Sequence, residues 1–166
     1  MSKSWNNKIF KYIQISVDQA SKKLAEERGS CPDAEEYGFK ERFSNKTAIA
    51  PTASISIICG GASPGVEPIA ANSYTHKTLS GSYNVRNKYL KKVLEKYGKN
   101  DDETWSTITT NLGSVEHLDF LTRNEKDVFK TAFELDQKWI VELGADRTPY
   151  ISQAQSINIF LPADVH

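Results

Sequence analysis

The residues whose types and spacing best suit binding chemistry lie between Pro51 and Ser56. This segment carries a hydroxyl group at every second position, on Thr52, Ser54 and Ser56. It follows a short apolar run, Thr47–Ala50, which must end at Pro51 because proline has no N–H group for a sheet ladder. A turn of small residues between a strand and a helix can bind phosphate, because free backbone N–H groups and the helix dipole face the anion. The segment therefore predicts an anion-binding turn.

The same residues allow a second interpretation. Ile55–Ile58 could continue the β-strand, with a serine on its solvent-facing side. The sequence has neither the Gly-x-x-x-x-Gly-Lys-Ser/Thr loop nor the Gly-x-Gly-x-x-Gly pattern, so neither common nucleotide-binding loop applies. Whether Ile55 begins a helix or extends a strand thus decides between the two readings.

Five further side chains could take part in catalysis. Cys59 would be a nucleophile if a helix N-terminus activated its thiol, and is otherwise a structural cysteine, as we expect for Cys31. Glu67, in Val-Glu-Pro, could be a general base or the anchor of a turn. His76 and His117 have no neighbouring serine and aspartate that would indicate a triad. The two cysteines form no Cys-x-x-Cys pair, and no metal-ligand spacing is present.

Several longer motifs occur in an order that identifies a family. Ile-Ala-Pro-Thr-Ala-Ser-Ile-Ser at 49–56 is followed by Ser-Pro-Gly-Val-Glu-Pro at 63–68, Tyr-Thr-His-Lys-Thr-Leu-Ser-Gly at 74–81 and Asp-Arg-Thr-Pro-Tyr-Ile-Ser-Gln-Ala-Gln-Ser-Ile-Asn at 146–158. Together they closely resemble the large (α) subunit of class I ribonucleotide reductase over essentially the whole chain. That subunit is several times longer than this sequence.

The resemblance implies a fold and a site. The fold class is α/β: a partial segment of the ten-stranded α/β barrel of ribonucleotide reductases, helix-rich with short parallel strands. Residues 1–166 would form a single incomplete segment of the catalytic barrel domain. In the family, the loop that matches this one holds the substrate diphosphate. The binding residues that the resemblance implies are Pro51, Thr52, Ala53, Ser54 and Ile55.

The resemblance also implies a function and partners. The chain would bind a ribonucleoside diphosphate for radical-based reduction to a deoxyribonucleotide, a DNA precursor. The family's radical cysteine, in Asn-x-Cys-x-Glu, and its paired tyrosines have no counterpart in this sequence. We therefore assign no catalytic residue, no metal and no bound cofactor to this segment, and expect the isolated chain to be inactive. Its partners would be the rest of the α subunit, a small radical-generating (β) subunit with a metal centre, and a thioredoxin or glutaredoxin reductant.

An opening Met just ahead of a family helix suggests either a split gene or a truncated reading frame. Two alternatives to the proposed function also remain at the sequence level. The first alternative to the reductase function is a non-enzymatic remnant, or a phosphate-binding module that never assembles into an active reductase. A relative that uses adenosylcobalamin or a glycyl radical on the same barrel is a further possibility, although the flanking motifs fit class I better.

Composition fits a globular cytoplasmic protein. Of 166 residues, 25% are charged and 39% hydrophobic, and the formal net charge is zero. The charge balance predicts binding to neither nucleic acid nor a membrane, and the sequence has no apolar run that could span one and no signal peptide. Two isolated cysteines favour a reducing cytoplasm over a disulfide framework.

Periodicity and punctuation predict the elements that would position the loop. Two parallel strands, 47–50 and 151–161, should be joined by a right-handed crossover. Between them we expect helices with buried apolar faces and one hairpin. The predicted elements are a helix over 9–28 ending at Gly29, a hairpin over 73–85, a helix capped by Asn87, a helix opened by a capping box at Asn100–Glu103 and ended by Gly113, and the longest helix, from Thr122 to Gly144, burying Phe133 and Trp139.

Overall fold

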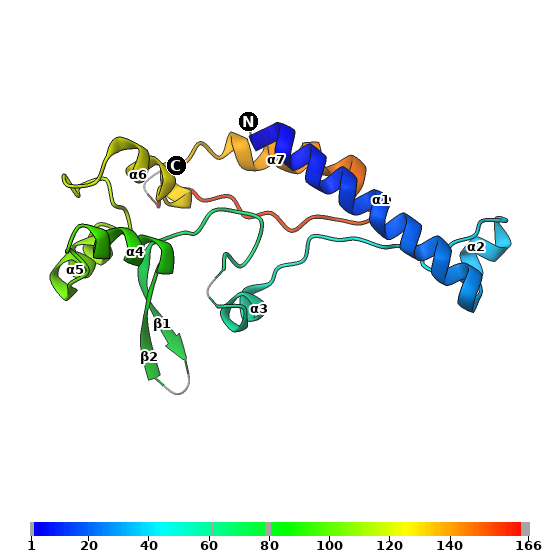
Figure 1. The fold of residues 1–166 in the computed structure, drawn as a ribbon, viewed down its shortest axis with the longest axis horizontal. Coiled ribbons are helices and arrows are strands. Elements are labelled where there is room, and N and C mark those ends of the chain that lie inside the picture. Colours follow the sequence, from blue (N-terminus) through cyan, green and yellow to red (C-terminus); the bar gives the residue numbers. More distant parts are fainter. Residues whose placement is uncertain (1, 61, 79–80, 164–166) are drawn as a thin grey trace. The chain divides into compact units, whose positions relative to one another are not determined.

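A computed structural model describes residues 2–60, 62–78 and 81–163 of the chain (Figure 1). The chain forms two compact units, each with its own packing. Unit 1 consists of Met1–Pro51 and Lys138–Ile157, and unit 2 of Thr52–Gln137 and Asn158–His166. None of the helices in the described ranges combines the length and apolarity needed to cross a membrane.

Unit 1 is built on one long helix. The helix predicted over 9–28 is confirmed but begins earlier, at Ser2; it is continuous to Arg28, and Gly29 ends it with a positive φ of 83°. It is the longest helix of the described chain and packs against α7. The elements of unit 1 are α1 (Ser2–Arg28), α2 (Pro32–Glu36), α7 (Lys138–Arg147) and the 3₁₀ turn η2 (Thr148–Tyr150).

The two predicted parallel strands meet only briefly. Ile49 and Gln155 form a parallel bridge, in which the Ile49 N–H donates to Ala154 at 3.2 Å and the Ser156 N–H donates to Ile49 at 2.8 Å. The pairing is parallel as expected, but the continuous strands over 47–50 and 151–161 are wrong, since each is reduced to one bridge residue. Past the bridge, the N–H group of Phe160 donates to the side chain of Gln137 rather than to a neighbouring strand.

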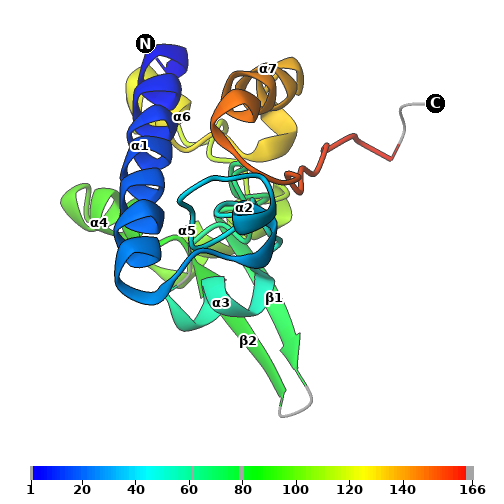
Figure 2. The ribbon, with the colours of Figure 1, turned by 90° about the vertical axis from the view of Figure 1, so that its right-hand side faces the viewer.

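Unit 2 contains a hairpin and a set of short helices. The predicted hairpin is confirmed as an antiparallel pair in which Ser73 lies opposite Arg86. It extends away from α4 and α5 (Figure 2). The elements of unit 2 are α3 (Ala53–Ile58), β1 (Ser73–Thr78), β2 (Gly81–Arg86), α4 (Lys88–Lys96), α5 (Asp102–Thr110), α6 (Arg123–Val128) and the 3₁₀ turn η1 (Ala132–Glu134).

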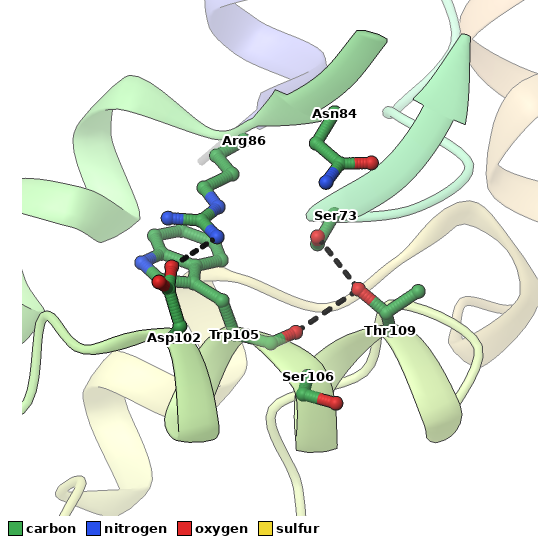
Figure 3. Close-up of a pocket in the computed structure, with 7 residues that line it drawn as sticks. All are labelled: Ser73, Asn84, Arg86, Asp102, Trp105, Ser106 and Thr109. Atoms are coloured by element: carbon green, nitrogen blue, oxygen red, sulfur yellow. Dashed lines mark hydrogen bonds and ion pairs between the residues drawn. The ribbon is translucent and has the colours of Figure 1, made fainter. Parts of the chain in front are cut away.

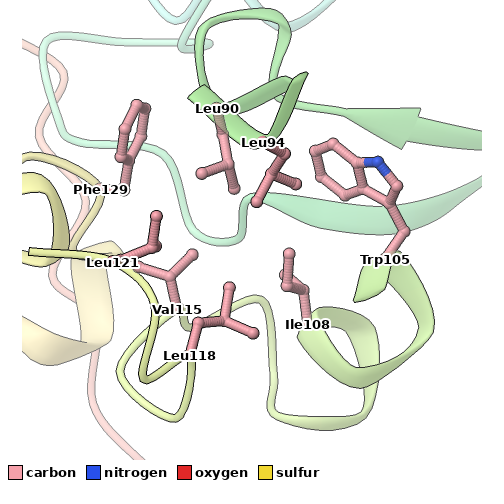
Figure 4. Packing of buried hydrophobic residues seen from close by; sticks show 8 residues of the cluster. All are labelled: Leu90, Leu94, Trp105, Ile108, Val115, Leu118, Leu121 and Phe129. Carbon is pink, nitrogen blue, oxygen red and sulfur yellow. The ribbon is translucent and has the colours of Figure 1, made fainter. Parts of the chain in front are cut away.

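The core of unit 2 lies where α4 and α5 meet the loop that follows them (Figure 4). Trp105 is the largest fully buried side chain, and its indole Nε1 donates to Asn100 at 2.8 Å. A buried indole N–H needs such an acceptor, so Trp105 fills the core without leaving its one polar atom unpaired. The cluster consists of Leu90, Leu94, Trp105, Ile108, Val115, Leu118, Leu121 and Phe129.

Two predicted helix starts are confirmed and one is shifted. Asn87 caps α4 by accepting from the N–H groups of its first turn, and Thr122 opens α6 with a reciprocal capping box. The predicted box at Asn100–Glu103 is wrong. The cap of α5 is Asp101, whose carboxylate accepts from Thr104 N at 2.7 Å, because the Asn100 side chain is engaged by Trp105.

The predicted long helix from Thr122 to Gly144 is also wrong. It is divided into α6, η1 and α7, because the backbone N–H of Ala132 donates to Ile69 at 2.9 Å instead of continuing a helix. Gly144 lies buried inside α7 rather than ending it. Phe133 and Trp139, expected in the core, are about half exposed, at 49% and 51%. Helical spacing of apolar residues persists across the breaks, so it could not reveal them.

The carboxylate of Glu134 predicts a pH dependence for the folding of unit 2. Burial raises its pKa, but hydrogen bonds from Ser114 and Thr131 outweigh this, so the pKa lies below its ordinary value of 4.5. The stabilisation is present above the unfolded-state pKa and is lost as the pH falls through the lower folded-state pKa. In urea titrations from pH 6 to pH 3, Glu134→Gln should therefore lose less stability than the unsubstituted chain. Equal losses in the two proteins would contradict this role.

Candidate functional site

The candidate anion-binding turn leads directly into a helix. The chain is extended up to Pro51, and α3 begins at Ala53, with the Ser56 N–H donating to the Thr52 carbonyl at 2.8 Å in its first turn. The alternative in which Ile55–Ile58 continues a strand is therefore wrong. The physical reason is local, since a helix can start at once after a proline that cannot pair in a sheet.

The first turn of α3 presents backbone donors to solvent. Ala53, Ser54 and Ile55 are all exposed, with Ile55 58% accessible. As the first three residues of a helix, their N–H groups have no intrahelical acceptor. No acceptor for them occurs elsewhere in the described part of the chain. Three amides and the Ser54 hydroxyl are thus available to an anion.

Thr52 has a different role from its neighbours. Its N–H and its Oγ1 both donate to the carbonyl oxygen of Pro64, at 2.8 Å and 2.9 Å. These bonds hold the start of α3 against the turn that contains Pro64. The donors open to a ligand are therefore those of residues 53–55. The assignment of all five residues, Pro51–Ile55, to a diphosphate site remains a prediction.

Glu67 lies buried in the same unit and is 4% exposed. Its Oε1 accepts from the backbone N–H of Asn158 at 2.5 Å and from the Asn158 side chain at 3.3 Å. A carboxylate engaged in this way is an anchor between two chain segments, and the structure favours this reading over that of a general base. Sequence reasoning missed Asn158 as the partner, because no local signal links residues so far apart.

Among the side chains that the structure describes, the other reactive groups do not assemble into a catalytic group. Cys59 is exposed just past the C-terminal end of α3, so the helix N-terminus that the nucleophile hypothesis needs is at the opposite end. His117 Nε2 lies 3.0 Å from Thr107 Oγ1, and burial lowers its pKa below the ordinary 6.5, as does nearby Lys126. His76 lies on β1, but its side chain is outside the described part of the structure.

A polar pocket of about 380 Å³ lies between the hairpin and α5 (Figure 3). Arg86 donates to Asp102 at 2.8 Å and lies over the ring of Trp105, 5.2 Å from its centroid. The hydroxyls of Ser73 and Thr109 lie 2.8 Å apart. These groups bind one another, and none of the predicted site residues lines the pocket. The lining residues are Ser73, Asn84, Arg86, Asp102, Trp105, Ser106 and Thr109.

Comparisons with known proteins identify the same family as the sequence motifs do. A family model described as the barrel domain of ribonucleotide reductase matches residues 33–166. The ribonucleoside-diphosphate reductase large subunit of Invertebrate iridescent virus 6 is 47% identical over 165 residues, which cover 97% of this chain and 17% of that protein. The large subunit of Caenorhabditis elegans is 36% identical over 120 residues, 72% of this chain and 15% of the relative.

A solved structure gives the same result for the fold. The class Id ribonucleotide reductase alpha subunit of Actinobacillus ureae superposes with a TM-score of 0.84 at 39% identity, covering 95% of this chain and 28% of that one. The predicted fold, a partial segment of the α/β barrel, is confirmed. This chain spans about a sixth of the length of the viral relative, of which it covers 17%. The chain belongs to the ribonucleotide reductase family and corresponds to part of the barrel domain of its large subunit.

Proposed function

We propose that this chain is the part of a ribonucleoside-diphosphate reductase large subunit that holds the diphosphate of the substrate. The observation that carries the proposal is the first turn of α3, where the N–H groups of the exposed residues Ala53, Ser54 and Ile55 have no acceptor among the described residues. Pairs of amides at a helix start suit the oxygens of a diphosphate, and the helix dipole favours its negative charge. Family membership points to the same substrate class.

The contribution of this chain to the reaction is positioning. Fixing the diphosphate at α3 would place the attached ribose at a defined distance from a radical cysteine supplied elsewhere in the large subunit. Such positioning lowers the entropic part of an activation barrier without any reacting group on the positioning element. The remainder of the large subunit and a radical-generating small subunit are the partners that this role requires. The chain alone should show no turnover.

Titration with inorganic pyrophosphate tests the site. The backbone amide signals of Ala53, Ser54 and Ile55 should shift in NMR spectra of the 166-residue chain, while core amides such as that of Leu94 stay in place. Unchanged signals at saturating pyrophosphate would contradict the proposal. If the chain binds pyrophosphate but does not restore nucleotide reduction when combined with the rest of the large subunit, it is a binding remnant.

Substitution of Ser54 should weaken this binding. Ser54→Trp places a bulky side chain among the three amides, so the dissociation constant for pyrophosphate should rise at least about tenfold, the equivalent of one lost charge-assisted hydrogen bond. Ile58→Trp is the matched control, because Ile58 is 84% exposed at the other end of α3. Equal affinities of the two variants would exclude the first turn as the binding site.

A further inference from the structure

The buried carboxylate of Glu67 has no partner of opposite charge among the described residues. Among the described residues, one residue donates to this carboxylate: Asn158, through its backbone N–H and its side-chain amide. Burying a carboxylate is costly, and bonds from N–H groups to a charged acceptor are among the stronger ones in a protein. The cost of burying the Glu67 carboxylate therefore suggests that the segments it joins need to be held together.

The turn at residues 63–67 packs closely against the Glu67 carboxylate. A Cβ atom added at Gly65 would lie 2.0 Å from Glu67 Oε2, far inside contact distance. The backbone of Gly65 therefore lies against the carboxylate, and an alanine here would require the end of the Glu67 side chain to shift. The hydroxyl of Ser63 closes the same turn by donating to the Glu67 carbonyl at 2.6 Å.

This turn also holds the start of α3. Pro64, between Ser63 and Gly65, supplies the carbonyl that accepts both the N–H and the Oγ1 hydrogen of Thr52. Thr52 is the residue immediately before the three exposed amides of α3. A continuous set of contacts thus runs from Asn158 through Glu67 and the turn at 63–67 to Thr52, all within unit 2.

We infer that Glu67 is a positioning residue for the anion-binding turn: its carboxylate fixes the turn at 63–67, and the Pro64 carbonyl in turn fixes Thr52 and the orientation of the amides of residues 53–55. The identity of the ligand in this inference rests on the proposed function, whereas the contacts between Glu67, the turn and Thr52 do not depend on it. Glu67 touches no substrate in this scheme and transfers no proton. Its effect on binding passes through Thr52.

A double-mutant cycle on the 166-residue chain tests the link. Hydrogen exchange at the Thr52 amide reports on its bond to Pro64, and the dissociation constant for inorganic pyrophosphate reports on the site. Glu67→Ala and Gly65→Ala should each speed exchange at Thr52 and weaken pyrophosphate binding by at least about tenfold, the size expected for losing a bond to a charged group. The double variant should be no worse than Glu67→Ala, because removing the carboxylate makes room for the new Cβ.

Two further variants separate positioning from general destabilisation. Glu67→Gln keeps an acceptor oxygen for Asn158 and should restore most of the protection at Thr52, whereas Glu103→Ala removes an exposed carboxylate of the same unit and should change nothing. The amide of Leu94, in the core, serves as the folding control. If Glu67→Ala unfolds the unit, Gly65→Ala and Glu67→Gln carry the test.

The outcomes are distinct. Exchange at Thr52 that stays at the unsubstituted rate in a folded Glu67→Ala or Gly65→Ala variant overturns the inference, as does a double variant whose losses simply add. If exchange at the Thr52 amide changes as expected but pyrophosphate does not shift the amide signals of the unsubstituted chain, the proposed function fails. The structural coupling between Glu67 and Thr52 is then still supported. If pyrophosphate binds equally well to all folded variants, the proposed site survives and the positioning role of Glu67 does not.

Discussion

Replacing Asn72 by alanine is expected to destabilise unit 2 by about 1–3 kcal/mol, because the buried Phe129 carbonyl is left without a donor. The Gly113 carbonyl, which keeps the backbone N–H of residue 72, and the half-buried Asn87 amide each lose one further bond. Asn72 is 1% exposed. Its Nδ2 donates to the carbonyls of Gly113 and Phe129, at 3.0 Å and 2.7 Å. Its Oδ1 accepts from Asn87 at 2.8 Å. One side chain therefore joins the turn after α5, the end of α6 and the residue that caps α4.

Chemical denaturation followed by hydrogen exchange at the Leu94 amide measures this loss in unit 2. Asn84→Ala is the matched control, because Asn84 is exposed on β2 and a surface substitution there should stay within about 0.5 kcal/mol. Asn72→Asp should be as damaging as alanine, since it places a carboxylate oxygen against two carbonyl oxygens. A loss for Asn72→Ala no larger than that of the control would show that the two carbonyls find other partners.

Local hydrogen-bonding rules explain what the sequence could predict in this fold. Asn87 and Thr122 cap their helices with bonds to residues two or three positions away, so side-chain type and spacing were sufficient. The start of α3 is of the same kind, because Pro51 excludes a continuing strand. The proposed diphosphate turn was therefore identifiable as a sequence feature before its geometry was known.

Contacts between distant residues explain what could not be predicted. Glu67 and Asn158 are separated by 91 positions, and neither has a neighbour that signals the pairing. Gly113 illustrates the same limit: it was expected only to end a helix, yet a Cβ at this position would lie 2.4 Å from the Cβ of Ala71. Periodicity describes one element at a time and carries no information about which backbone will approach it.

Replacing Arg147 by methionine is expected to have a comparable effect on unit 1, about 1–3 kcal/mol, since two half-buried acceptors, on Gln155 and Asn6, lose this donor. Arg147 is 4% exposed on α7. Its Nε donates to Gln155 Oε1 at 3.0 Å, its Nη1 lies 3.5 Å from Asn6 Oδ1, and its guanidinium lies over the ring of Phe10, 5.5 Å from the centroid. It thus joins α1, α7 and the segment that pairs with Ile49.

Hydrogen exchange at the Ile49 amide, which donates to Ala154, reports directly on the segment that Arg147 holds against α1 and α7. Arg147→Lys should recover little of the lost stability, because a lysine cannot reproduce the planar group that bonds Gln155 while covering an aromatic ring. Arg28→Met, at an exposed position in the last turn of α1, removes the same charge without a buried partner and should be nearly neutral. If Arg147→Lys matched the unsubstituted chain, a point charge alone would suffice, and the geometry of the guanidinium would have no structural role in unit 1.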